Sequence, residues 1–148
     1  MREKSSFSRH NPEVTHVRLR YPLASTGVVV QRWRRAVVIR ERDLDHITAI
    51  PDPWGFAVRL GLGTGLRWGE MQRAKAGDVL GNVLTVSQTK SGRVRRIPLG
   101  EGLLREIRSH VGLLLPFRDP SVFARKVRRL SGVQRFHPHQ LRHTFACT

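Results

Sequence analysis

The chain has 148 residues, enough for one domain with a core of its own, and carries 27 lysines and arginines against 11 acidic residues, a net charge of +16. No apolar run approaches the length of a membrane span, and the N-terminus lacks the apolar stretch of a secretory signal. The single cysteine, Cys147, excludes an internal disulfide and favours a reducing, cytoplasmic setting, with no membrane partner expected.

The positive charge is concentrated at both ends of the sequence. Residues 1–40 contain nine basic and two acidic side chains, residues 41–90 six of each, and residues 91–148 twelve and three. Such a field attracts polyanions, with nucleic acid as the default partner. Arginine outnumbers lysine 23 to 4, which suits bidentate contacts with phosphate oxygens. A GC-rich genome explains part of that ratio, but not the excess of positive charge.

The patterning divides the chain into two parts. Residues 1–40 show no sustained period, and we interpret them as a basic N-terminal arm of uncertain structure. From residue 41 onward, short helices are predicted near residues 43–47 and 54–62. The sequence GLGTG (61–65) then breaks the pattern, and a third helix is predicted over residues 67–76, ending at Gly77.

A small sheet follows these helices. The turn Gly81-Asn82 lies between apolar pairs, and a second turn over residues 89–92 separates expected strands at 83–88 and 93–98. We therefore predict a three-stranded antiparallel meander with Lys90 at a tip. Helical spacing continues over residues 101–115, ended by Pro116, and over 121–130, with Asp119 and Pro120 at its start. A last helix should begin near Pro138, so the fold class is α+β and mainly helical.

Several polar motifs are candidates for chemistry. GLGTG is similar to a phosphate loop but lacks the GK[ST] ending, so an interhelical turn is the preferred interpretation. Arg67 and Glu70 share a helix face, which taken alone indicates only a surface ion pair. Lys90 at a hairpin tip is commonly just solvated, although a mobile tip also allows an ammonium to reach a bound phosphate.

The C-terminal stretch HPHQLRHTFACT is the densest cluster. His139, Arg142 and His143 lie at i, i+3 and i+4, on one helical face. His137, His139 and His143 are also possible metal ligands, but no carboxylate stands in an H-E-x-x-H arrangement. A basic constellation without acidic ligands favours an anion, so no metal and no cofactor are expected.

The order of three motifs is more specific than any one of them. TGLRWGE (64–70), TKSGRVRRIPL (89–99) and HPHQLRHTFA (137–146) resemble the catalytic domain of the tyrosine recombinases, the phage-integrase family, over residues 41–148. The resemblance implies a mainly helical domain with a small antiparallel sheet, and a function in DNA integration and recombination. It also implies double-stranded DNA as the partner and a cytoplasmic, nucleoid-associated location.

The resemblance also assigns roles to residues. Arg67 and Arg142 would clamp the scissile phosphate, Lys90 would protonate the departing 5′ oxygen, and His139 would hydrogen-bond the phosphate. Supporting roles fall to Glu70, which would orient the pocket, and to His143, which would be structural. The arginines that follow the lysine are expected to contact DNA: Arg93, Arg95 and Arg96.

Two departures from the family pattern matter. The family's nucleophilic tyrosine follows the last motif, whereas the only tyrosine here is Tyr21, far upstream in an unrelated context. Forty residues are also too few for the helical DNA-clamping domain that usually precedes the catalytic one. The sequence therefore predicts a partial catalytic domain that binds DNA phosphate but is inactive alone. The alternatives are a non-catalytic DNA-binding or regulatory fragment, acting with a full-length recombinase, a nonfunctional gene remnant, and a generic basic nucleic-acid protein.

Overall fold

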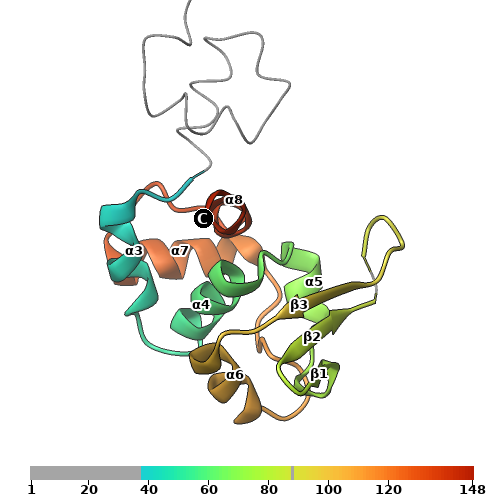
Figure 1. Cartoon of the computed structure of the whole chain (residues 1–148). Coiled ribbons are helices and arrows are strands. Elements are labelled where there is room, and N and C mark those ends of the chain that lie inside the picture. Colours follow the sequence, from blue (N-terminus) through green and yellow to red (C-terminus); the bar gives the residue numbers. More distant parts are fainter. Residues whose placement is uncertain (1–37, 88) are drawn as a thin grey trace, which may run out of the picture.

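The computed structural model describes residues 38–87 and 89–148 (Figure 1). Its helices and strands follow in the order α3 (Glu41–Thr48), α4 (Trp54–Thr64), α5 (Trp68–Arg73), the 3₁₀ turn η2 (Ala76–Asp78), β1 (Val79–Leu80), β2 (Val83–Val86), β3 (Arg95–Pro98), α6 (Glu101–Arg108), α7 (Pro120–Ser131) and α8 (His139–Cys147). The predicted α+β class, mainly helical with a small sheet, is confirmed.

The sheet is the predicted antiparallel meander, in the order β1-β2-β3. Val79 pairs with Leu84 across the first turn. In the second hairpin, Val86 pairs with Arg95 at the end of the strands nearest the turn. Gly81 has a φ of +64°, as a tight two-residue turn requires. The predicted turn at residues 89–92 is present, closed by a bond from the Gly92 N–H to the Thr89 carbonyl. Lys90 therefore lies at a hairpin tip.

Helix α4 forms the centre of the domain. It packs against α3, α6, α7 and α8, and most of its residues are buried, including Phe56 and Leu60. Two glycines of this segment allow α8 to pack closely against α4. A Cβ on Gly61 would lie 2.7 Å from Leu141 Cδ1, and a Cβ on Gly65 would lie 2.3 Å from a ring carbon of Phe145. The motif GLGTG thus serves helix packing. The expected interhelical turn was wrong for residues 61–64, which are the last turn of α4, and only Gly65 leaves the helix.

Several predicted boundaries were wrong. Helix α4 continues through the expected break and ends only at Gly65, whose φ of +68° gives it a left-handed cap. Helix α5 ends at Arg73, so Gly77 is not its cap. The strands are shorter than expected, and the helix predicted over residues 101–115 stops at Arg108.

Other boundaries were right. Asp119 caps α7, its carboxylate accepting a 2.7 Å bond from the Ser121 N–H, with Pro120 in the first turn. Helix α8 begins directly after Pro138. Within the described part, no helix is long and apolar enough to span a bilayer.

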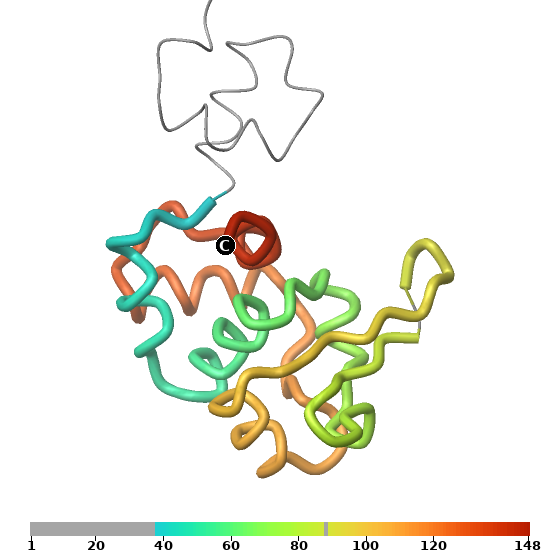
Figure 2. Tube along the Cα trace, viewed as in Figure 1, coloured from blue at the N-terminus to red at the C-terminus, as the bar shows by residue number. Residues whose placement is uncertain are grey.

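The N-terminal arm, residues 1–40, falls largely outside the described residues. Of its last three positions, Ile39 is buried and its N–H donates a 3.0 Å bond to the Thr144 hydroxyl. Figure 2 shows this first described segment lying beside α8. Residues 38–40 therefore pack with the domain that follows them.

Candidate active site

The first and last motifs meet at the end of α4. The Arg142 guanidinium, on α8, donates a bond to the Gly65 carbonyl through Nη1. The carbonyl of Gly65 is available because α4 ends at this left-handed residue. Phe145 packs against the Gly65 Cα, where a side chain would not fit. Only Leu66 separates Gly65 from Arg67, so this contact brings Arg142 close to the first motif across 77 positions of sequence.

Arg67 stands at the N-cap of α5, and a buried carboxylate holds it there. Glu70 Oε2 accepts a 3.1 Å bond from the Arg67 backbone N–H, and Glu70 Oε1 lies 3.4 Å from Arg67 Nη1. The Glu70 side chain is 2 % exposed, whereas that of Arg67 is 44 % exposed. The expected surface ion pair is therefore a buried acid that fixes an accessible guanidinium.

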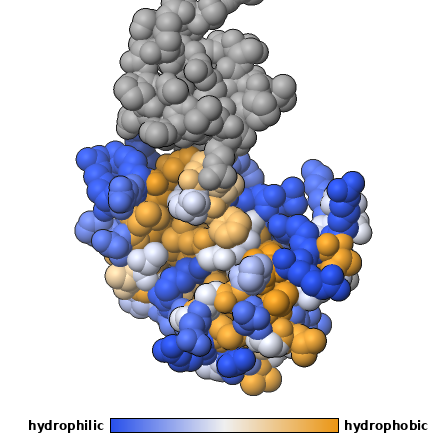
Figure 3. Space-filling model, viewed as in Figure 1, coloured by the Kyte–Doolittle hydropathy of each residue, from blue (hydrophilic) through white to orange (hydrophobic). Residues whose placement is uncertain are grey.

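Glu70 has a second arginine partner from the sheet. Arg95 Nη2 lies 2.8 Å and 2.5 Å from the two carboxylate oxygens. Sequence analysis assigned Arg95 to DNA contact together with Arg93 and Arg96, but its guanidinium is tied to Glu70. Arg93 and Arg96 are exposed on the hairpin, and hydrophilic residues gather over this region in Figure 3.

Lys90 and Arg67 line the same pocket. This cavity is bounded by the N-terminal half of α5 and the hairpin tip, and its other lining residues are Gly69, Glu70, Arg73 and Thr89. Residues of the first and the middle motif therefore line one pocket. Arg73 and Thr89 were not singled out in the sequence, although Arg73 lies six residues after Arg67 on the same short element.

The histidines complete the cluster on α8. The rings of His139 and His143 meet edge to face with centroids 4.5 Å apart, and His139 is exposed. Burial lowers the pKa of His143, and the positive charges of His139 and Arg142 lower it further. His143 thus favours its neutral form, which suits the structural role expected of it.

Electrostatics show how closely the arginines are gathered. Partial burial lowers the pKa of Arg142, the charges of Arg67 and Arg95 add to this effect, and Glu70 opposes it. Guanidinium groups collected around one carboxylate leave an excess of positive charge, which binds an anion with several oxygens. Among residues 38–87 and 89–148, no group of three His, Cys, Asp or Glu side chains is placed to hold a metal ion.

Comparisons with known proteins show what the chain is similar to. No family model matches the sequence. The integrase of Escherichia phage P2 is 34 % identical over 88 residues, which cover 57 % of this chain and 26 % of the integrase. The catalytic domain of bacteriophage HP1 integrase aligns with a TM-score of 0.56 at 28 % identity, over 74 % of this chain and 68 % of that one.

XerA recombinase shows the same fold, with a TM-score of 0.59 at 23 % identity, over 74 % of this chain and 48 % of that one. The chain thus spans about a quarter of the length of the curated integrase that it matches. The mainly helical domain with a three-stranded sheet is the fold of these recombinase catalytic domains. The chain is therefore similar in sequence to a phage integrase and in fold to the catalytic domain of the tyrosine recombinases, the phage-integrase family.

Proposed function

We propose that the basic cluster binds the scissile phosphate during DNA strand cleavage and joining. Attack on a phosphodiester places extra negative charge on the non-bridging oxygens. Arg67 and Arg142 stabilise that charge without a metal, because their guanidinium groups are fixed before the reaction by Glu70 and by the Gly65 carbonyl. Fixed donors cost no reorganisation when the charge develops.

Proton transfer falls to the remaining residues. Lys90, at the hairpin tip and lining the Arg67 pocket, protonates the departing 5′ oxygen as a general acid. His139, exposed at the start of α8, hydrogen-bonds the phosphate and assists proton transfer. Glu70 orients Arg67 without reacting, and His143 supports the ring of His139.

The nucleophile is the part of the reaction that the described residues do not supply. Residues 38–148 contain no tyrosine, and Tyr21 lies outside the described part. In our proposal, the attacking tyrosine comes from outside residues 38–148, for example from a full-length recombinase that acts with this chain on double-stranded DNA in the nucleoid. The chain alone then forms no covalent phosphotyrosyl intermediate.

The observation that supports the proposal is the proximity of three distant motifs: the first two line one pocket, and the third is hydrogen-bonded to the first. Arg142 bonds to the carbonyl two residues before Arg67, and Lys90 lines the pocket of Arg67. The similar proteins are integrases and a recombinase, which supports DNA strand cleavage and joining as the reaction class.

A nicked suicide DNA substrate tests the proposal. We expect salt-dependent binding and no SDS-resistant protein–DNA adduct. If about five phosphates are engaged, log Kobs should fall with log[salt] with a slope of roughly −4 to −5. Arg67→Gln should make that slope less steep by about 0.9, whereas Arg108→Gln, on α6, should not. An adduct that disappears in Tyr21→Phe would overturn the assignment of the nucleophile.

A non-catalytic regulatory role is the second candidate, favoured by the absence of tyrosine from residues 38–148. Adding this chain to an intact recombinase separates the two roles. If the phosphate site is used, Arg67→Ala abolishes the effect of the added chain on recombination. If the chain only occupies DNA or pairs with the enzyme, Arg67→Ala acts no more strongly than Arg108→Ala. A gene remnant instead predicts no cooperative melting transition.

A further inference from the structure

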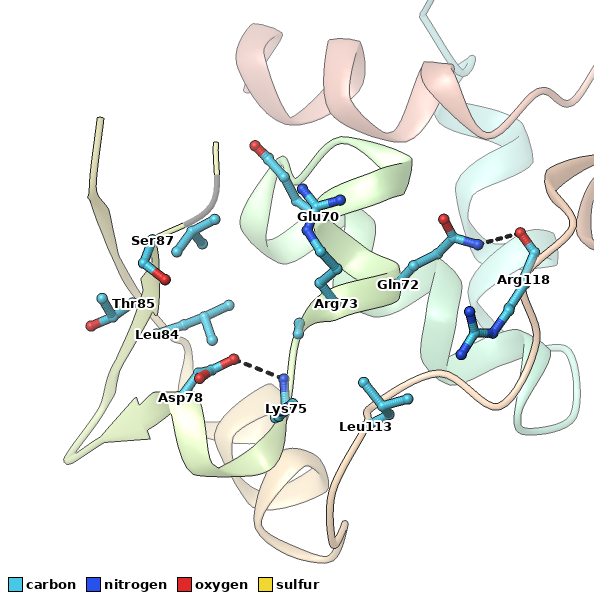
Figure 4. Close-up of a pocket in the computed structure, with 12 residues that line it drawn as sticks. Glu70, Gln72, Arg73, Lys75, Asp78, Leu84, Thr85, Ser87, Leu113 and Arg118 are labelled. Carbon is cyan, nitrogen blue, oxygen red and sulfur yellow. Dashed lines mark hydrogen bonds between the residues drawn. The ribbon is translucent and has the colours of Figure 1, made fainter. Parts of the chain in front are cut away.

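A second pocket adjoins the candidate active site and shares Glu70 and Arg73 with it. Its cavity, of about 520 Å³, is bounded by the C-terminal half of α5, by strand β2 and by the segment 113–118 (Figure 4). The polar side chains in its lining include Gln72, Arg73, Lys75, Thr85, Ser87 and Arg118. Three cationic residues thus line one cavity from three segments, beside the acids Glu70 and Asp78, and cations suit an anion when the acids are otherwise engaged.

Hydrogen bonds to its backbone carbonyl hold Arg118 at the wall of this pocket, so its guanidinium remains available to bind an anion. Its carbonyl accepts bonds from Trp68 Nε1, at 3.0 Å, and from Gln72 Nε2. Two side chains of α5 therefore fix the position of Arg118. Among the described residues, its guanidinium has no hydrogen-bond or ion-pair partner, and the residue is exposed.

Lys75 is arranged in the same way. Its backbone N–H donates a 2.9 Å bond to Asp78 Oδ2, and its backbone pairs with Leu113. The Asp78 carboxylate is occupied in capping this turn, while the Lys75 ammonium has no ion-pair partner within the described part of the chain. Glu70, the other acid in the lining, is already neutralised by Arg95. Positive charge therefore exceeds negative charge in this pocket.

The two pockets are neighbours along one short helix. Glu70 and Arg73 line both of them. The pockets therefore adjoin along α5, which has six residues and a length of about 9 Å at 1.5 Å per residue. A DNA strand rises about 3.4 Å per nucleotide along the helix axis. The second pocket therefore lies within about three nucleotides of a phosphate held at Arg67.

We propose that this second pocket binds a further backbone phosphate of the same DNA, a few nucleotides from the scissile one, through Arg118 and Lys75. The assignment rests on the proposed function for the identity of the polyanion. Its consequence is mechanical: contacts at both ends of α5 set the register of the strand, so that one particular phosphate reaches Arg67.

Salt-dependent binding to a duplex provides the test. The double variant Lys75→Gln/Arg118→Gln removes two exposed charges, and the control Arg105→Gln/Arg125→Gln removes the same charge from exposed positions on α6 and α7 that line neither pocket. If the two cations share one phosphate, the log–log slope becomes less steep by about 0.9 in the pocket variant and is unchanged in the control. Equal changes in both variants, or none in either, would overturn the proposal.

A free anion is the competing ligand. Inorganic pyrophosphate is titrated into the chain without DNA, and backbone amide shifts of Thr85 and Arg118 are followed. Saturable binding that the pocket variant loses, together with an unchanged salt slope, would assign the pocket to a free anion and contradict our proposal.

The test also separates this pocket from the proposed active site. Arg67→Gln reports on the first pocket and the Lys75/Arg118 variant on the second. A slope that responds to the second variant alone refutes the phosphate clamp and leaves the second pocket in place. A slope that responds to Arg67→Gln alone supports the phosphate clamp and refutes the second pocket.

Discussion

Arg95 and Glu70 join the sheet to the helix that presents Arg67. One nitrogen of the Arg95 guanidinium lies within hydrogen-bond distance of both oxygens of a carboxylate that is 2 % exposed. The same carboxylate accepts the Arg67 backbone N–H. The position of the hairpin that bears Lys90 and the position of Arg67 therefore depend on a single buried acid.

Glu70→Gln should destabilise the domain, because it leaves the positive charges of Arg95 and Arg67 without a neutralising partner. Leaving buried groups poorly satisfied costs about 1–3 kcal/mol, and the partial exposure of both arginines favours the lower part of that range. Urea denaturation measures the loss. Glu101→Gln, in the first turn of α6 and exposed, is the matched control. Equal stabilities of the two variants would contradict the role given to Glu70.

Gly65→Ala should also destabilise the chain, for two reasons that can be separated. A left-handed conformation costs a residue with a Cβ about 1–2 kcal/mol, and the new Cβ would meet the Phe145 ring. Repeating the substitution in a Phe145→Ala background removes the second contribution. Gly77→Ala, where a Cβ meets nothing within 4 Å, should be close to neutral. A Gly65→Ala midpoint equal to that of Gly77→Ala would refute both reasons.

Local patterns predicted most elements, and long-range contacts explain the main failure. Leu103, Leu104, Ile107, Val111 and Leu114 keep helical spacing, yet α6 ends at Arg108. Beyond it, the Ala76 N–H bonds to the Gly112 carbonyl, and the Leu114 N–H bonds to the Ala74 carbonyl. These bonds extend the chain along the segment after α5 and leave Val111 97 % exposed. Periodicity within one segment contains no information about such partners.

For the candidate site, the sequence predicted which residues to consider but not the contacts that orient them. The order of the motifs along the chain singled out Arg67, Lys90, His139 and Arg142 as candidates, and the structure brings Arg67 near Lys90 and Arg142. The contacts that orient them were not predictable. The Gly65 carbonyl is an ordinary backbone group until α8 packs on α4. Arg95 is one of three arginines in RVRR, and only the sheet register turns it toward Glu70.

Acid should weaken the fold through His143. Its folded pKa lies below the ordinary value of about 6.5 because of burial and the neighbouring charges of His139 and Arg142. Between the two pKa values the unfolded chain binds more protons, so the stability is complete above about pH 6.5 and decreases as the pH falls toward the folded pKa. His143→Asn should flatten this part of a Tm–pH profile. His46→Asn, exposed on α3, should not. Parallel profiles for the two variants would exclude His143 as the source.

Arg142 offers a test of geometry against charge. Its fork donates one bond to the Gly65 carbonyl and, in the proposed function, presents its other donors to a phosphate. Arg142→Lys keeps the charge but loses the fork, so the salt slope of DNA binding should stay the same while the affinity falls. Arg142→Gln loses both, and its slope should become less steep by about 0.9. Arg129→Lys and Arg129→Gln, exposed in the last turn of α7, control for charge alone. If Arg142→Lys binds as tightly as the unchanged chain, the fork has no part in holding the phosphate, and Arg142 acts only through its charge.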